Sequence, residues 1–235
     1  MLLTGTTQGI GNHLYQRFYR EYEITTVNRS YFHGENILCD LSDVEQTVDL
    51  CAKLKGMSFD VLINNAGGGT PMHFSDLTAK ELLKCTNLNY HAPVLLMQAI
   101  LEGMKERGYG RVVNISSIAS KSPRALIPHY GAAKASLEVF SKSMARYYSD
   151  CGITINCVCP GGVQTDTSMK NRRIMAELSN MKIEYYNDAM VSGNGLGRMV
   201  EQNEVGDAVA FFISDSSKAV SGQTLNVCGI KEVHS

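Results

Sequence analysis

The sequence of 235 residues lacks the features that mark membrane, secreted and nucleic-acid-binding proteins. It contains no apolar run approaching the roughly 20 residues of a membrane-spanning helix. Its first residues, MLLTGTTQG, have neither the basic start nor the apolar stretch of a secretory signal. With 22 basic and 23 acidic residues, its net charge of −1 does not favour nucleic acid or a membrane surface. We therefore expect a cytoplasmic protein with neither kind of partner.

Metal-binding and redox motifs are also lacking. The sequence has seven cysteines, but none form a Cys-x-x-Cys pair, and Cys157 and Cys159 lie within a strand-like pattern. Buried thiols in a reducing compartment are the better interpretation. His73, His91 and His129 are scattered along the chain, so we expect no metal site.

The length and the hydrophobic content of 44% are sufficient for one substantial core, so residues 1–235 are expected to form a single domain. No internal repeat or low-complexity tract interrupts it. Apolar segments separated by helical patterns predict strands at 1–4, 24–28, 36–39, 61–64, 111–116, 154–159 and 224–227. This alternation predicts an α/β fold with a doubly wound parallel sheet of about seven strands and helices on both faces.

Tyr130 and Lys134 begin a segment, HYGAAKASLEVFSKSMARYY, whose apolar residues recur at helical spacing. Residues four apart share one face of a helix, so the ammonium lies beside the phenol and can favour phenolate. Ser117, thirteen residues before the tyrosine, adds a hydroxyl. A lone Tyr-x-x-x-Lys match also occurs as an ordinary surface pair. Together with the hydroxyl, the pair predicts the proton-transfer site of an oxidoreductase.

Gly5, Gly9 and Gly11 lie between the short apolar segment 1–4 and the helical pattern of HLYQRFYREY. Glycine allows the backbone to turn tightly and to approach a pyrophosphate, and a helix N-terminus offers N–H groups and partial positive charge. The spacing Gly-x-x-x-Gly-x-Gly departs from the common Gly-x-Gly-x-x-Gly fingerprint. The turn predicts dinucleotide binding, and a glycine-rich turn without a ligand is the alternative.

Three later segments add to this prediction. VLINNAGGG at 61–69 is expected to form a floor beside the cofactor, and RVVNISSIAS at 111–120 carries Ser116 and Ser117 at its carboxyl end. Open α/β sheets bind ligands at the carboxyl ends of their strands. ITINCVCPGGVQT is a further strand that breaks at Pro160, Gly161 and Gly162, where the backbone can lie against a flat ring.

In order and spacing, TGTTQGIG, NNAG, Asn89, Ser117, YGAAK and PGGVQT resemble the motifs of the short-chain dehydrogenase/reductase family over nearly the whole chain. The length and the glycine pattern are similar to its compact, single-domain oxidoreductases. The resemblance implies a Rossmann-type fold and a nicotinamide dinucleotide. Residues expected to contact that cofactor are Gly5, Thr7, Gly9, Ile10, Gly11, Asn28, Arg29, Asp40, Leu41, Asn65, Ala66, Gly67, Tyr130, Lys134, Pro160, Gly161, Val163 and Thr165.

The resemblance also implies catalytic roles. Hydride transfer to a carbonyl carbon makes an alkoxide that must be protonated, and Tyr130 would be the general acid or base. Lowering a tyrosine pKa from about 10 to near 7 takes roughly 4 kcal/mol, which Lys134 and the cofactor would share. Ser117 would bond the carbonyl oxygen, and Asn89 would kink its helix and hold a water beside Lys134. Asn87 competes for that role, but the distance from Asn89 to Ser117 fits the family better.

Cofactor preference is expected to depend on the end of the second strand, ITTVNRS. Enzymes that prefer NAD usually place an acidic residue here to bind the ribose 2′-hydroxyl. Asn28 is neutral and Arg29 can bind a 2′-phosphate, so we expect NADP(H) to be favoured over NAD(H). A solvated arginine is the alternative. Asp40 resembles an adenine-contacting aspartate, but it could equally cap the helix that begins near Ser42.

The stretch of about 166–199 is longer than a simple connection and contains five methionines. It predicts a mobile lid over the substrate, with a packed surface helix as the alternative. The expected pocket walls are small or apolar and include Ala119, His129 and Gly162, with the lid. Arg172 and Arg173 are expected to be solvated. We therefore predict an uncharged or locally apolar ketone or secondary alcohol as substrate.

The leading hypothesis is an NADP(H)-dependent oxidoreductase that interconverts a ketone and a secondary alcohol. The alternative is a catalytically silent dinucleotide-binding regulator or scaffold of the same fold. The family resemblance also implies a homodimer or homotetramer, with helices at 78–106 and 128–150 as interfaces. Leu137, Phe140, Met144 and Tyr148 lie at near-helical spacing there, although they could face their own sheet instead.

Overall fold

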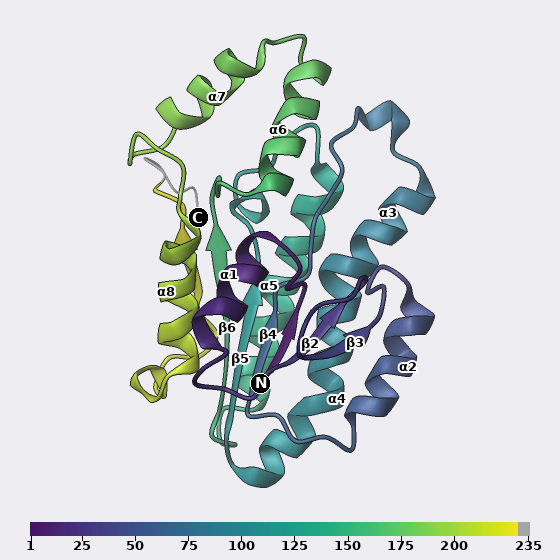
Figure 1. Ribbon diagram of the computed structural model, residues 1–235, viewed down its shortest axis with the longest axis vertical. Helices are drawn as coiled ribbons and strands as arrows, with labels where there is room; N and C mark the ends of the chain where they lie inside the picture. Colours follow the sequence, from purple (N-terminus) through teal and green to yellow (C-terminus); the bar gives the residue numbers. More distant parts are fainter. Residues whose placement is uncertain (230–235) are drawn as a thin grey trace.

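The computed structural model describes residues 1–229, which form one seven-stranded sheet with helices on both faces (Figure 1). The strand order is β3-β2-β1-β4-β5-β6-β7, and every neighbouring pair is parallel. The strands are β1 (Leu2–Thr4), β2 (Thr25–Asn28), β3 (Glu35–Leu38), β4 (Val61–Asn64), β5 (Gly110–Ile115), β6 (Ile153–Pro160) and β7 (Thr224–Val227). The doubly wound α/β prediction is confirmed, and each predicted strand end lies within one residue of the observed end. Residues 230–235 of the predicted domain lie outside the described residues.

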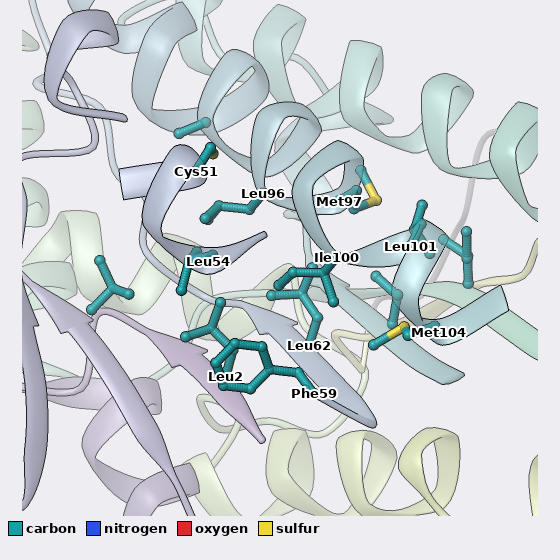
Figure 2. Close-up of a cluster of buried hydrophobic side chains, with 14 of the residues drawn as sticks. Leu2, Cys51, Leu54, Phe59, Leu62, Leu96, Met97, Ile100, Leu101 and Met104 are labelled. Carbon is teal, nitrogen blue, oxygen red and sulfur yellow. The ribbon is translucent and has the colours of Figure 1, made fainter. Parts of the chain in front are cut away.

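The sheet is covered on both faces because successive side chains of each strand point to opposite sides. The helices are α1 (Gly9–Phe18), α2 (Val44–Leu54), α3 (Ala79–Thr86), α4 (Ala92–Arg107), α5 (Pro128–Tyr147), α6 (Asp166–Leu178), α7 (Ile183–Ser192) and α8 (Gln202–Ile213). Leu2 joins the core beneath α2, α4 and α5, whereas Leu3 joins the core beneath α1 and α8. Figure 2 shows the first core, in which Leu54 of α2 and Leu96 of α4 lie near sheet residues such as Leu62.

A π-helical turn, Asn87–His91, connects α3 to α4. Such turns widen a helix by one residue and often occur at functional sites. The single long helix that the sequence predicted over 78–106 is therefore divided into α3, the π-helical turn and α4, and Asn89 lies in the turn.

Helices α6 and α7 project above the carboxyl edge of the sheet, at the top of Figure 1. They occupy the stretch that the sequence predicted as a lid. The segment following β6 is joined to the chain after α7 by a parallel bridge between Val163 and Val200. None of the helices among residues 1–229 has both the length and the apolar content that crossing a lipid bilayer requires.

The predicted interface stripe on α5 faces the protein's own core. Leu137 is fully buried and Tyr148 is 7% exposed, and both belong to the core beneath α4 and α5. Phe140 and Met144 pack against the same core. This packing agrees with the alternative interpretation of these residues, because their near-helical spacing matches the face that covers the sheet.

Candidate active site

The carboxyl ends of β1, β4, β5 and β6 open into a groove with a cavity volume of about 390 Å³. The strand order reverses between β1 and β4, so the connections after these two strands leave in opposite directions. A crevice at such a reversal is where open α/β sheets bind ligands. The groove is thus a consequence of topology.

The glycine turn after β1 fits tightly against the end of β4. Gly5 has φ of +70°, and a Cβ there would lie 2.8 Å from the Ala66 Cα. The Thr4 Oγ1 accepts hydrogen bonds from the backbone N–H groups of Asn65 and Ala66 at 3.0 and 2.9 Å. A Cβ on Gly11 would collide with the Gly5 carbonyl oxygen. Only glycine allows this compact turn.

Helix α1 begins in the groove without a side-chain cap. Its N-cap residue, Gln8, makes no capping hydrogen bond, and its first turn holds no acidic residue. By contrast, α2, α3 and α6 are capped by Asp43, Thr78 and Thr165. An uncapped N-terminus beside close-packed glycines is suited to a phosphate group. The turn therefore fits the pyrophosphate of a dinucleotide.

Tyr130, Ser117 and Lys134 meet at the centre of the groove. A side-chain hydrogen bond joins Ser117 to Tyr130. Ser117 follows the end of β5, and its Oγ accepts a hydrogen bond from the Ala119 N–H at 3.2 Å. The Lys134 Nζ lies 5.9 Å from the Tyr130 ring centroid and donates to the Ile115 carbonyl at 2.7 Å. The three side chains that the sequence linked are brought together.

The direction of the Tyr130 pKa differs from the sequence-based expectation. Burial raises the pKa of Tyr130 to about 12, although the hydrogen bond from Ser117 opposes the rise. Burial also lowers the pKa of Lys134 to about 8. Removing both groups from water disfavours their charged forms, and the ammonium is bonded to a backbone carbonyl rather than to the phenol. The protein alone therefore keeps Tyr130 protonated at neutral pH.

Asn89 lies behind the groove wall and contacts the central loop. Its Nδ2 donates to the carbonyls of Gly68 and Cys85, each at 2.8 Å, and its Oδ1 accepts from the Gly68 N–H at 3.0 Å. A Cβ on Gly67 would lie 2.9 Å from the Asn89 Oδ1 and 3.0 Å from the Lys134 Nζ. Asn87, the competing candidate, bonds the Ser42 carbonyl instead. The arrangement favours Asn89 as the neighbour of Lys134.

Sequence reasoning missed Glu138, a buried carboxylate one helical turn beyond Lys134 on α5. Its Oε1 accepts from the hydroxyls of Ser116 and Ser120 at 2.5 Å each and from the Cys159 thiol at 2.9 Å. Ser116 and Ser120 flank Ser117, so the carboxylate anchors the turn that carries it. The repeated spacing of four along Tyr130, Lys134 and Glu138 was the available signal.

The end of β2 presents no carboxylate to the groove. The amide of Asn28 is occupied internally: its Nδ2 donates to the Thr6 Oγ1 and the Asn36 Oδ1, and its Oδ1 accepts from the Thr6 N–H. Arg29 and Ser30 are exposed and line the groove beside it. Ser30 was not among the predicted cofactor contacts, because only the tertiary structure shows that the residues after β2 line the groove.

All of the predicted cofactor contacts except Asp40 line the groove. The Asp40 Oδ1 accepts hydrogen bonds from the backbone N–H and the hydroxyl of Ser42, while Asp43 caps α2, so Asp40 holds a turn and is not the helix cap.

His129 was expected in the pocket wall but is buried outside the groove lining. It directly precedes Tyr130, and neighbours on a helix point in different directions.

The lid stretch contributes Met175 and Met190 to the groove, together with Arg172. Arg172 is therefore partly buried in the groove and not fully solvated as predicted, whereas Arg173 is exposed as expected.

All seven cysteines are free thiols, and six of them are buried. Burial raises the pKa of Cys157 to about 11 and that of Cys159 to about 12, so these thiols are unreactive at neutral pH.

Comparisons with known proteins agree with this geometry. A family model described as short chain dehydrogenase matches residues 1–176. A putative ketoacyl reductase of Streptomyces coelicolor is 30% identical, with 97% of this chain and 95% of that protein aligned. The 3-oxoacyl-(acyl-carrier-protein) reductase of Haemophilus influenzae is 27% identical, with 97% and 96% aligned. A variant of actinorhodin polyketide ketoreductase, solved with NADPH, superposes with a TM-score of 0.88 at 29% identity, covering 97% of this chain and 95% of that one.

The Glu138 cluster yields a stability prediction. Replacing Glu138 by leucine leaves buried hydroxyl donors without their acceptor, and each such loss costs about 1–3 kcal/mol. We expect Glu138→Leu to lower the free energy of unfolding in urea by about 3 kcal/mol, whereas Glu138→Gln, which keeps an acceptor oxygen, should lose about 1 kcal/mol. Glu106→Leu, at an exposed position of α4, is the control. Equal effects at positions 138 and 106 would contradict the anchoring role.

Proposed function

The chain belongs to the short-chain dehydrogenase family, and from this premise we propose that it reduces a ketone to a secondary alcohol with NADPH. The observation that carries the proposal is the convergence of Ser117, Tyr130 and Lys134 in a groove whose glycine turn fits a dinucleotide. Relatives named as ketoacyl reductases and an acetoacetyl-CoA reductase support carbonyl reduction as the reaction class.

The glycine turn and the uncapped start of α1 would hold the pyrophosphate, and Lys134 would hold the nicotinamide ribose. NADPH, when bound, supplies the hydride. Ser117 donates a hydrogen bond to the substrate carbonyl oxygen, and Tyr130 donates its proton to that oxygen as negative charge develops. A pKa of about 12 keeps Tyr130 in the protonated form with which reduction starts. This form supports reduction as the direction for which the site is prepared.

Asn89 and Glu138 position these groups. Asn89 fixes the Gly68 backbone beside Lys134 and is suited to hold a water that returns protons to the site. Glu138 fixes the residues that flank Ser117. Helices α6 and α7 act as the lid that orders when substrate binds, and Met175 and Met190 supply adaptable apolar contacts.

Preference for NADPH rests on charge at the end of β2. A carboxylate here would repel a 2′-phosphate, but Asn28 is neutral and its amide is committed to Thr6 and Asn36. Arg29 supplies a guanidinium that can bind phosphate with two hydrogen bonds, and Ser30 adds a hydroxyl.

The protein forms a homodimer or homotetramer through the outer faces of α3 and α5. The inward stripe of α5 is occupied by the core, but Leu83, Val139 and Tyr147 on these helices are 59%, 66% and 66% exposed. Exposed apolar side chains on adjacent helices favour association.

The central test of function is Tyr130→Phe, which removes only the phenolic hydroxyl. We expect carbonyl reduction to fall by about a thousandfold or more, because the developing alkoxide loses its proton donor, while the dissociation constant for NADPH changes by less than about threefold. Turnover is read from NADPH absorbance with a panel of ketones, and binding from calorimetry. Activity within a few-fold of the parent would refute the role of Tyr130. Tight NADPH binding by the parent with no turnover across the panel would favour the regulator or scaffold instead.

The cofactor preference is tested by replacing Arg29 with alanine. A charge-assisted contact to the 2′-phosphate is worth about 1.5 to 3 kcal/mol, so NADPH affinity should fall about tenfold or more while NADH affinity is unchanged. Arg20→Ala, an exposed arginine outside the groove, serves as control. Equal affinity of the parent protein for the two cofactors by calorimetry would exclude the preference.

The assembly is tested by light scattering at micromolar concentration. We expect a mass of two or four times 25.8 kDa. Val139→Glu should shift the protein toward smaller species, because it places a charge on the apolar contact. A parent protein that scatters as a monomer would rule out this association.

A further inference from the structure

The groove contains cations at both ends and no acid. Its lining includes Arg29, Arg124, Lys134 and Arg172, and none of the aspartates or glutamates among residues 1–229 belongs to it. Arg29 lies at the end of β2, at the end assigned to the cofactor. Arg124 and Arg172 lie beyond Tyr130 and have no role in the proposed reaction so far.

Helix α6 lines the groove and carries Arg172 away from the glycine turn. At its start, Thr165 packs against Gly9, where a Cβ would lie 3.3 Å from the Thr165 methyl carbon. Arg172 is seven residues further on, which is about 10 Å along a helix. The neighbouring Asn171 donates to the Gly69 carbonyl at 3.1 Å, and a Cβ on Gly69 would lie 2.7 Å from the Tyr130 Cβ. Arg172 is thus about two helical turns from the phosphate end, and it lines the same groove as Tyr130.

The Arg172 guanidinium is partly desolvated and incompletely bonded. Its Nη1 donates to the Asn187 Oδ1 at 3.1 Å, while its buried Nε has no hydrogen-bond partner in residues 1–229. Burial lowers the pKa of Arg172, and no carboxylate offsets the loss of hydration. Holding such a cation without an anion is unfavourable.

Arg124 contacts helix α7, the same helix that carries the hydrogen-bond partner of Arg172. It lies in the segment before α5, and its Nη1 contacts the Met190 Sδ at 3.8 Å, a weak acceptor. Met190 and Asn187 are one turn apart on α7, so both guanidinium groups lie along one side of this helix. The acidic residues of α7, Glu184 and Asp188, are exposed and do not line the groove.

Among residues 1–229, several arginines elsewhere in the chain are paired with acids, whereas the remaining unpaired ones, Arg20, Arg29, Arg146 and Arg173, are exposed to solvent. Arg17, Arg107 and Arg111 each form an ion pair with an aspartate, at 2.8, 3.4 and 3.1 Å. Within the described part of the chain, neither Arg124 nor Arg172 has a carboxylate within 4.0 Å. Two guanidinium groups that line one groove and have no carboxylate partner provide a site for a bound anion.

We propose that Arg124 and Arg172 bind an anionic group of the substrate, a carboxylate or a phosphate, and thereby orient its ketone toward Tyr130. The proposal rests on the proposed carbonyl reduction and departs from the uncharged substrate that the sequence predicted. The substrate class is a keto acid or keto phosphate whose chain between the two groups packs against Ile127, Met175 and Met190. A groove lined by apolar side chains and by two arginines fits a ligand that is both apolar and anionic.

Binding without turnover tests the site directly. The probes are 5-oxohexanoate with its methyl ester, and dihydroxyacetone phosphate with dihydroxyacetone, titrated by calorimetry into the protein alone and with NADP⁺. We expect at least one anion to bind roughly tenfold or more tightly than its neutral counterpart, and Arg172→Gln or Arg124→Gln to abolish the difference. Whichever pair responds identifies carboxylate or phosphate as the preferred group.

Matched variants separate charge from structure. Arg173→Gln, at the exposed neighbour, should leave the preference intact. Asn187→Ala removes the hydrogen bond of Arg172 but keeps its charge, so it should retain the preference as well. The site is overturned if each anion binds no better than its neutral partner, or if Arg173→Gln weakens anion binding as much as Arg172→Gln.

Turnover with NADPH is measured separately on the same compounds. An anion that binds through Arg172 but is not reduced, together with no reduction of any neutral ketone, would contradict the proposed reaction and leave the anion site standing. Reduction of neutral ketones with no anion preference in binding would retain the reaction and remove the site.

Discussion

The buried ammonium of Lys134 is the constraint on which the site depends. It is 2% exposed, and a cation removed from water must find acceptors or lose its charge. The Ile115 carbonyl at the end of β5 supplies one acceptor, and glycine at position 67 leaves the space that lets Lys134 and Asn89 approach the central loop. Asn89 lies buried in the π-helical turn, and Glu138 adds negative charge on the next turn of α5. Much of the local structure therefore serves to hold one positive charge beside one phenol.

The parallel sheet explains why residues so distant in sequence share one groove. Parallel strands all end at the same edge, so the turns after β1, β4, β5 and β6 converge there without any local attraction between them. The helices pack on the faces and leave that edge open, and α6 and α7 then cover it (Figure 1). The edge is also where backbone N–H groups of α1 lack side-chain caps, so its electrostatic character is positive before any arginine is counted.

The charge distribution of the groove relates cofactor to substrate. Arg29, Lys134, Arg124 and Arg172 all line the groove, and no carboxylate of residues 1–229 belongs to its lining. A groove of one sign concentrates ligands of the opposite sign. Such a field favours a negative charge, but the Lys134 ammonium bonds the Ile115 carbonyl instead of the phenol, so burial still raises the pKa of Tyr130. A protonated Tyr130 is therefore compatible with a groove that is lined by cations.

The sequence by itself determined the fold class, the strand positions and the Ser117, Tyr130 and Lys134 set, because these depend on local periodicity and on spacing within one helix or at one strand end. It also identified nearly all of the glycines that line the groove.

The tertiary structure decided the direction in which individual side chains point. Leu137 and Tyr148 face the core, His129 lies outside the groove lining, and Asp40 holds a turn. The tertiary structure also decided the partners of Glu138 and the presence of Arg124 and Arg172 in one groove, since these groups come from positions 18 or more residues apart. Spacing along a chain predicts neighbours on one element, whereas contacts between elements are set by packing.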